Sequence, residues 1–139
     1  MTVLEFKGYT VNEMNYKKNP NYIPGSSKKI SLNPTFSSDN DISDNEIHVN
    51  LDIKVGSLKE TSIPFEASCS VQGLFEYNPN EDEDDIGIDT FLRNNALAIL
   101  YPYARAIIAT LTTSSNEFPG YNLPTVNITK ALESNNDNS

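Results

Sequence analysis

The sequence predicts an α+β fold, in which several β-strands come before one long α-helix. Within the first 77 residues, three stretches carry apolar residues at the alternating spacing of strands with one buried face, and residues 3–16 follow that spacing less regularly. Residues 95–116 then contain a single charged side chain, Arg105, and place apolar residues at helical spacing. A chain of 139 residues can bury one hydrophobic core. We therefore expect one domain over residues 1–133 and a disordered tail over residues 134–139.

The clearest strand covers residues 46–55. Its odd-numbered residues are aliphatic and its even-numbered ones polar, so one face is dry and the other is wet, as antiparallel sheets permit. Residues 62–77 alternate in the same way. Leu74 interrupts the polar face beside Gly73, which indicates either a β-bulge or the close approach of another segment.

Two further strands have less regular patterns. Residues 3–16 carry apolar positions of both parities, which favours a strand that bends near Gly8. Residues 30–36 alternate, and Pro34 favours a place at the edge of the sheet. The polar residues 37–45 would connect this strand to the next.

The long helix carries apolar side chains on two of its sides. One stripe is Ala96, Leu100, Tyr103, Ile107 and Leu111, and the other is Leu97, Tyr101, Ala104, Ile108 and Leu111. Because a surface helix normally has one apolar stripe, we expect both sides to be covered, one of them by another chain. Asn94 or Asn95 is suited to cap the helix, and Pro102 predicts a bend over residues 98–102.

Residue types that carry catalysis or bind metals are scarce. His48, the only histidine, falls on a polar strand face, and Cys69, the only cysteine, falls on an apolar one, so the two cannot share a metal. The sequence contains no nucleophile-elbow motif and no phosphate-binding loop. The carboxylates of residues 78–89 lie in a loop where nothing apolar would raise a pKa. We expect no enzyme activity, no metal and no cofactor.

The charge of the chain argues against several partners. A net charge of −9 disfavours binding to nucleic acid and to an anionic membrane surface. The apolar helix is too short to span a bilayer, and the N-terminal residues lack the pattern of a signal peptide. We therefore expect a soluble, cytoplasmic protein. Its surplus of apolar surface indicates oligomer contacts or a site for an apolar partner.

Three motifs resemble the SecB family of protein-export chaperones. The segment Leu100-Tyr101-Pro102-Tyr103-Ala104-Arg105 is similar to the family's Leu-Phe-Pro-Tyr-Ala-Arg. The segment from Phe118 to Ile128 resembles the family's Phe-Pro-x-Leu-Asn-Leu-x-Pro-Val-Asn-Phe, with a small shift around Pro124. Gln72-Gly73-Leu74-Phe75 looks like the family's Gly-Gly-Ile-Phe. Together with the order of elements, the similarity covers residues 3–133.

This resemblance implies a four-stranded antiparallel sheet, a long helix, a crossover loop and a short second helix, assembled as a dimer of dimers. It implies an ATP-independent molecular chaperone that holds unfolded polypeptides or preproteins in apolar grooves beneath residues 117–132, and so keeps them competent for export or folding. The expected groove residues are Phe75, Tyr101, Leu123, Val126, Ile128 and Leu132. The expected contacts within a homo-tetramer are Tyr103, Ile107, Ile108 and Leu111.

Delivery of clients to the motor protein SecA stays open. The family docks to SecA through acidic residues on the exposed sheet face and through a zinc-binding C-terminal tail. Glu13 matches one acidic position, and Lys17, Glu66 and Ser68 fall where the other docking residues are expected, but the C-terminus holds no Cys or His. SecB-like proteins also act as chaperones of antitoxins. The alternative is therefore an interaction protein dedicated to one partner, such as an antitoxin, without a role in export.

Overall fold

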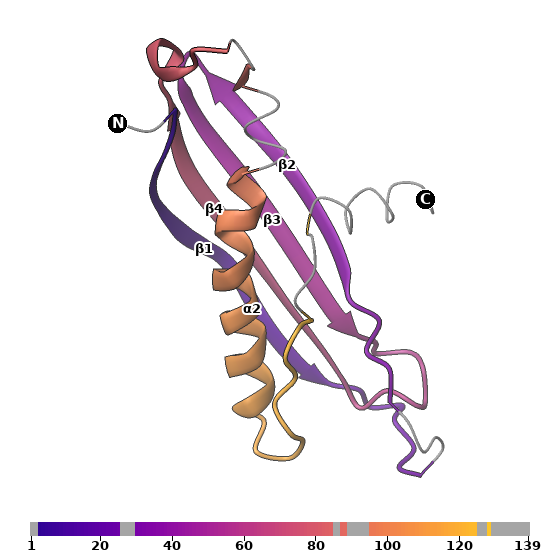
Figure 1. Cartoon of the computed structure of the whole chain (residues 1–139). Coiled ribbons are helices and arrows are strands. Elements are labelled where there is room, and N and C mark those ends of the chain that lie inside the picture. The colour runs from indigo at the N-terminus through magenta and orange to yellow at the C-terminus, as the bar shows by residue number, and fades with distance from the viewer. Residues whose placement is uncertain (1–2, 26–29, 85–86, 89–94, 125–127, 129–139) are drawn as a thin grey trace.

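The computed structural model describes residues 3–25, 30–84, 87–88, 95–124 and 128. In these residues, a four-stranded antiparallel sheet carries a long helix along one face (Figure 1). The elements in chain order are β1 (Leu4–Lys18), β2 (Thr35–Ser43), β3 (Glu46–Gly56), β4 (Phe65–Tyr77), the short 3-10 helix η1 (Pro79–Glu81) and α2 (Leu97–Thr113). The strands lie in the order β1-β4-β3-β2, so β1 and β2 form the two edges. This arrangement confirms the predicted α+β fold.

The central strands β3 and β4 provide most of the sheet's share of the core. They pair from Glu46 opposite Glu76 to Gly56 opposite Glu66 without an irregularity. The five aliphatic side chains of β3 that were predicted to face the core are at most 3% exposed. A shift of one residue would turn them all toward water, so the alternation of the sequence determines this register.

Gly73 allows α2 to approach the sheet closely. A Cβ atom on this residue would lie 2.7 Å from Leu100 Cδ2 and 2.8 Å from Phe75 Cε2. Atoms do not approach this closely without a shift of one of them, so the absence of a side chain makes room for Leu100. Of the two explanations predicted for this position, close approach is therefore the right one.

The irregularities of the sheet lie on β1, the strand beside Gly73. The pairing of β1 with β4 shifts between Phe6 and Gly8 and again between Val11 and Glu13. Gly8 has a φ of 124°, which glycine adopts without the steric cost that a side chain would bring. The predicted bend near Gly8 is confirmed.

The prediction for the second strand is wrong. We expected a strand over residues 30–36 and a connection over residues 37–45, whereas β2 covers Thr35–Ser43 and only two residues connect it to β3. Asp44, the first of these two, has a φ of 55°, a conformation that Asp tolerates. As an edge strand, β2 is held by its backbone bonds to β3 and buries little. Its sequence therefore lacks the alternation that signals a half-buried strand.

Asn19 joins two loops at one end of the sheet. Its side-chain amide donates hydrogen bonds to the carbonyl oxygens of Glu60 and Ile63, both at 2.8 Å. Its side-chain oxygen accepts a bond of 2.9 Å from the Asn21 N–H. Because Asn19 is 5% exposed, water cannot readily replace these partners.

Substitution Asn19→Ala is expected to lower the free energy of unfolding by about 1–3 kcal/mol, because the Glu60 and Ile63 carbonyl oxygens each lose a hydrogen bond and Glu60 keeps only the bond from the Ile63 N–H. Asn21→Ala is the matched control, since the Asn21 amide donates to Leu58 at an exposed site. The control should change the free energy by less than about 0.5 kcal/mol. Chemical denaturation at one fixed protein concentration measures both, and equal effects would contradict the role of Asn19.

The helix α2 lies on the sheet through one stripe of side chains. The buried residues are Leu97, Leu100, Tyr101, Ala104, Ile108 and Thr112. The helix begins at Leu97, with Ala96 in the N-cap position and no side-chain capping bond. Asn95 is therefore not the cap, and Asn94 lies outside the described residues. Ala96 is fully buried, so packing on the sheet rather than capping defines this end. The helix is continuous through Pro102, near which a bend is expected.

Candidate functional site

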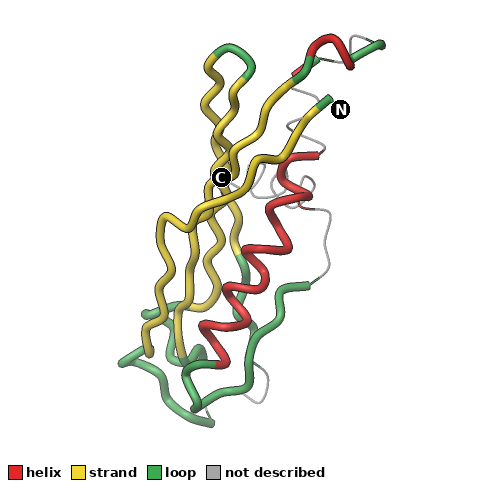
Figure 2. Tube along the Cα trace, turned by 90° about the vertical axis from the view of Figure 1, so that its left-hand side faces the viewer, coloured by secondary structure: helices red, strands yellow, loops and turns green. Residues whose placement is uncertain are grey.

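Residues 114–124, here called the crossover segment, run back alongside α2 (Figure 2). Thr112 attaches them to the helix, because its hydroxyl donates to the Ile108 carbonyl at 2.9 Å and accepts from the Tyr121 N–H at 2.7 Å. Gly120 lies so close to the Thr113 side chain that no Cβ would fit between them. The crossover segment is thus fitted against the last turn of α2.

Tyr101 forms a second attachment, nearer the start of the helix. Its hydroxyl donates a 2.6 Å hydrogen bond to the Pro124 carbonyl. Its ring meets the edge of the Phe36 ring on β2, with centroids 6.1 Å apart. Burial raises the pKa of Tyr101, and burial likewise raises that of Tyr121. Both phenols therefore stay protonated at neutral pH and can act as hydrogen-bond donors.

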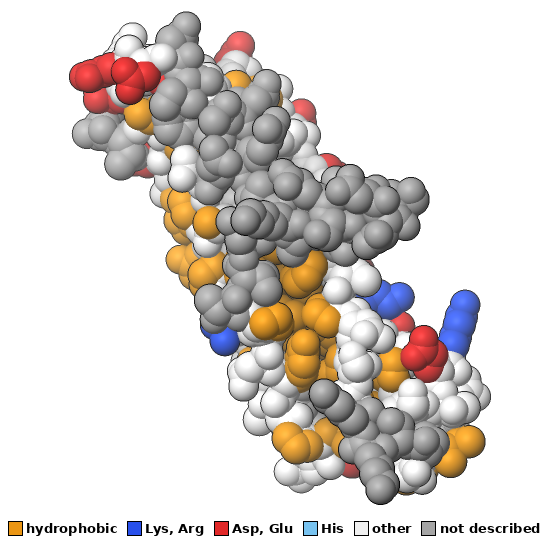
Figure 3. All heavy atoms as spheres, turned by 45° about the vertical axis from the view of Figure 1, so that its right-hand side comes forward, with side chains coloured by type: hydrophobic (Ala, Val, Ile, Leu, Met, Phe, Trp, Pro, Cys, Tyr) orange, Lys and Arg blue, Asp and Glu red, His pale blue; other side chains and the backbone are white. Residues whose placement is uncertain are grey.

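We call the surface formed by Phe36, Tyr101, Tyr121, Leu123 and Pro124 the crossover site. It joins β2, from the first third of the sequence, to α2 and to the crossover segment that directly follows α2. Phe36 and Tyr121 are half-buried, whereas Leu123 is fully buried. Figure 3 shows hydrophobic side chains gathered in a band along the middle of one face of the molecule.

Four of the six residues predicted for a client groove are buried within this chain. Their exposed fractions are 0% for Phe75, 6% for Tyr101, 0% for Leu123 and 3% for Ile128. The other two, Val126 and Leu132, lie outside the described residues. The sequence did not indicate Phe36, because only the fold brings it beside Tyr101. Tyr121 lies within residues 117–132, where the groove was expected, but was not named as a groove residue.

A second apolar surface, the helix patch, lies between α2 and β1. It is a shallow pocket of about 200 Å³ lined by Tyr9, Met14, Tyr103, Ala106, Ile107, Thr110 and Leu111. The rings of Tyr9 and Tyr103 stack with centroids 4.3 Å apart. Met14 is 53% exposed and Tyr103 is 37% exposed. A single copy of the chain therefore leaves this apolar surface in contact with water.

The helix patch contains three of the four residues predicted for oligomer contacts: Tyr103, Ile107 and Leu111. The fourth, Ile108, is fully buried between α2 and the sheet, so it belongs to the core of its own chain. A residue directly after Ile107 in a helix points about 100° away from it, which explains the difference. The sequence left Tyr9 and Met14 unassigned, because regular alternation would put them on opposite faces and only the register shift between Val11 and Glu13 brings both to the side of α2.

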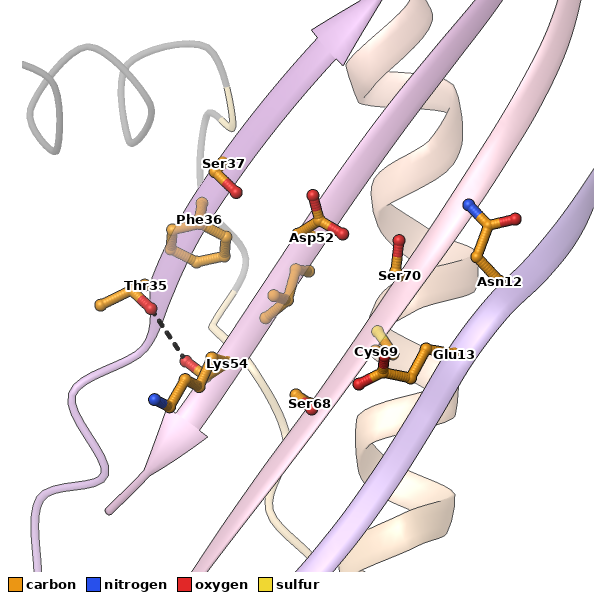
Figure 4. Close-up of a pocket in the computed structure, with 11 residues that line it drawn as sticks. Asn12, Glu13, Thr35, Phe36, Ser37, Asp52, Lys54, Ser68, Cys69 and Ser70 are labelled. Atoms are coloured by element: carbon orange, nitrogen blue, oxygen red, sulfur yellow. Dashed lines mark hydrogen bonds between the residues drawn. The ribbon is translucent and has the colours of Figure 1, made fainter. Parts of the chain in front are cut away.

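The face of the sheet that lies away from α2 is polar. A hollow of about 550 Å³ is lined there by residues from all four strands, among them Glu13, Asp52 and Ser68 (Figure 4). Asn50 donates to Asp39 at 2.8 Å and accepts from Gln72 at 3.1 Å, which links three strands through side chains. These bonds are exposed or partly buried, so this face of the sheet is open to solvent.

The four residues that were compared with a SecA-docking face have different positions and partners in the structure. Glu13 and Ser68 line this hollow. Glu66 forms a 3.3 Å ion pair with Lys54, and Lys17 lies opposite Glu66 in the pairing of β1 with β4. The acidic character expected of a docking face is therefore partly neutralised by lysines.

Cys69 lies in the core beneath α2, with its Sγ atom 3.8 Å from the Ala104 carbonyl oxygen. Burial, with a smaller effect of the Asp52 charge, raises the pKa of this thiol to about 12. In the described part of the chain, no three His, Cys, Asp or Glu side chains are placed to share a metal ion. None of the described helices has the length and apolarity to cross a membrane.

Cys69 should report on separation of α2 from the sheet. In the folded protein at pH 8, we expect a thiol reagent to react at least about 100-fold more slowly than in denaturant, because the thiolate is the reactive form. An unfolded thiol titrates near pH 8.5, whereas the folded one resists ionisation up to about pH 12. The neutral buried thiol therefore contributes to the free energy of unfolding in full below pH 8.5, and this contribution is lost as the pH rises toward 12. Rapid labelling of the folded protein would contradict this placement.

Comparisons with known proteins identify the class to which this fold and these surfaces belong. Residues 18–138 match the family model described as "Preprotein translocase subunit SecB". The chain therefore belongs to the SecB family, which is a family of chaperones rather than of enzymes. It is also 30% identical over 129 residues to the uncharacterised protein MJ0357 of Methanocaldococcus jannaschii, covering 90% of this chain and 79% of that protein.

Two solved structures share the fold. One is the SecB-like chaperone Rv1957 of Mycobacterium tuberculosis in complex with a ChAD peptide from the antitoxin HigA1, with a TM-score of 0.68, 16% identity and coverage of 88% of this chain and 90% of that one. The other is a protein of unknown function from Streptococcus agalactiae, with a TM-score of 0.51, 12% identity and coverage of 87% and 96%.

Proposed function

We propose that this protein is an ATP-independent chaperone that binds non-native polypeptides and keeps them competent for folding or export. The observation that carries the proposal is that α2 is apolar beyond the side covered by its own sheet. The helix patch lies on one flank of α2 and the crossover site on another. Apolar surface of this kind suits an apolar polypeptide better than a small polar substrate. The structural neighbour from M. tuberculosis, solved with a bound peptide, supports a polypeptide as the ligand.

The helix patch is proposed as the contact between copies of the chain. Tyr103, Ile107 and Leu111 on α2, with Met14 on β1, would be removed from water when two copies pair. Burial of such side chains stabilises an interface by about 25 cal/mol for each Å² of apolar surface. We infer a homo-oligomer, built as a dimer of dimers, with α2 facing α2 of another copy.

The crossover site is proposed as the place where a client segment binds. The rings of Phe36, Tyr101 and Tyr121 would form its wall and Leu123 its floor, and Phe75 and Ile128 are proposed to extend that floor. Val126 and Leu132 are proposed to extend it along the chain. Because Leu123 is fully buried, a client can reach this side chain only if the crossover segment, which carries it, moves off the helix. The Thr112 and Tyr101 hydrogen bonds to this segment stabilise the closed arrangement by about 0.5–1.5 kcal/mol each, which clients can overcome.

The strong negative charge fits this role. At −9 per chain, an oligomer stays soluble while it carries an apolar client, and it attracts basic segments. We propose that it acts in the cytoplasm without binding nucleic acid and without inserting into a membrane.

A dedicated role is the second candidate, and the peptide of an antitoxin in the neighbouring structure favours it. In this version the crossover site serves one partner, such as an antitoxin, and no transfer to SecA takes place. The ion pair of Glu66 with Lys54 on the exposed sheet face also makes that face less suited to a basic docking partner.

Affinity measurements with permanently unfolded proteins test the site and separate the two roles. Substitution Tyr121→Ser is expected to weaken client binding about tenfold. The control is Ile23→Ser, which removes an apolar side chain that is 56% exposed in the loop after β1. This variant should change the affinity for the client by less than about twofold. Comparable binding of several unrelated clients indicates a general chaperone, and binding of one partner alone indicates a dedicated one. If the two variants bind alike, the crossover site is not the client site.

A further inference from the structure

The crossover segment is firmly held where it leaves α2. The hydroxyl of Ser115 accepts hydrogen bonds of 3.3 Å from the N–H groups of Glu117 and Phe118. The ring of Phe118 lies against the rings of Phe65 and Tyr22, with centroids 5.9 Å and 6.1 Å away. Polar and aromatic contacts together therefore fix this part of the segment to the rest of the chain.

The last three described residues of the crossover segment have far fewer contacts. We call residues 122–124 the strap. Within the described residues, the strap makes one hydrogen bond, in which the Pro124 carbonyl accepts from the Tyr101 hydroxyl at 2.6 Å. Leu123 is fully buried, whereas the other two residues of the strap are exposed. One buried side chain and one hydrogen bond thus keep the strap closed.

The chain is fixed on both sides of the strap. Just before it, the Tyr121 N–H donates a 2.7 Å bond to the Thr112 hydroxyl. Beyond it, Ile128 is only 3% exposed. Opening of the strap is therefore an outward movement of residues 122–124 between two fixed points, and it needs no release of the rest of the crossover segment.

The Tyr101 hydroxyl serves the strap rather than the packing of its own ring. The ring meets the edge of the Phe36 ring, a contact that a phenylalanine would keep. Within the described residues, the hydroxyl bonds to the strap alone. The family motif compared with residues 100–105 has phenylalanine at this position, so the hydroxyl is an addition in this chain.

We propose that the Tyr101 hydroxyl is a latch that holds the strap over the crossover site and so limits the access of clients. This inference rests on the proposed client site and adds a device that sets its affinity. A client binds only molecules with an open strap, so its apparent affinity is reduced by the fraction that is closed. Loss of one hydrogen bond between neutral groups raises the open fraction about threefold to tenfold. The latch therefore weakens client binding, whereas a hydroxyl that contacts the client would strengthen it.

Opening of the strap can be measured without a client, through a thiol at position 123. In the whole protein with Cys69→Ala and Leu123→Cys, the new thiol reacts with a reagent only when the strap is open, because this position is fully buried. Adding Tyr101→Phe should speed the labelling about threefold to tenfold. The matched control, Tyr22→Phe, removes a phenol hydroxyl from a ring that packs on Phe118, outside the crossover site. It should change the rate by less than about twofold.

Substitution Phe118→Ala tests whether the strap moves alone. It removes both ring contacts at the fixed beginning of the crossover segment. If the whole segment lifted as one piece, this loss would speed the labelling of position 123 at least as much as Tyr101→Phe does. We expect an increase of less than about twofold, because the strap opens between fixed points that Phe118→Ala leaves in place.

Client affinity then tests the role of the latch. The Tyr101→Phe variant, without the other substitutions, should bind a permanently unfolded protein about threefold to tenfold more tightly than the wild type, mainly through faster association. Weaker or unchanged binding would overturn the proposal, as would labelling that Tyr101→Phe leaves unchanged or that Phe118→Ala speeds equally. If the labelling responds as expected but the wild type binds no unfolded protein, the proposed function fails and the latch stands. If clients bind but Tyr101→Phe changes neither quantity, the latch fails and the proposed function stands.

Discussion

Substitution Leu100→Ala is expected to lower the free energy of unfolding by about 2–5 kcal/mol. Leu100 is fully buried, and its methyl groups occupy the space left open by Gly73 on β4. Truncation removes apolar contacts and leaves a cavity between α2 and the sheet that a rigid sheet cannot close. Denaturation followed by circular dichroism at one protein concentration measures the effect, because oligomer formation would otherwise shift the apparent stability.

The partner substitution Gly73→Val makes this prediction specific. Alone it is expected to cost about 1–3 kcal/mol, since its side chain would overlap Leu100 Cδ2 and Phe75 Cε2. Combined with Leu100→Ala, the valine enters the vacated space, so the double variant should be more stable than the sum of the two losses predicts. Strict additivity would contradict the contact between Gly73 and Leu100.

Substitution Ile107→Asp is expected to raise the dissociation constant of the oligomer by about 100-fold or more, because an unpaired charge would be buried in the interface. Ile107 lies in the helix patch beside Tyr103 and Leu111. Sedimentation velocity over a range of concentrations measures the change. Far-UV circular dichroism should show the same secondary structure, since the patch is open to water in a single chain.

The matched control is Ala98→Asp, which places the same charge on an exposed position of α2 outside the helix patch. Near the start of a helix, a negative charge is favourable to helix formation. This variant should therefore assemble like the wild type. Equal dissociation of both variants, or a wild-type protein that stays monomeric at high concentration, would contradict the role of the helix patch.

Elements with a buried face could be predicted from the sequence, whereas an element defined by backbone pairing alone could not. The strict alternation over residues 46–55 determined both the position and the inward face of β3. The polar strand β2 had no such signal, because its exposed residues are compatible with a loop. The start of α2 was missed for a related reason: Ala96 packs against the core, and no local capping motif marks that contact.

The candidate sites show the same division. The sequence identified α2 as apolar on more than one side, and three helix-patch residues follow from helical spacing alone. It could not separate Ile107 from Ile108, because both fall on an apolar stripe and only the packing on the sheet assigns one to the core. Phe36 reaches Tyr101 through the fold of the whole sheet, which no local pattern encodes.

Suppression of aggregation tests the central claim most directly. A chemically denatured protein is diluted into buffer with and without the wild-type protein, in the absence of ATP, and light scattering is followed. The account predicts that scattering falls in proportion to the added protein, is nearly abolished at about one client per oligomer, and is unchanged by ATP. A folded and oligomeric wild-type protein that leaves the scattering of several unrelated clients, and of a candidate antitoxin, unchanged would contradict it.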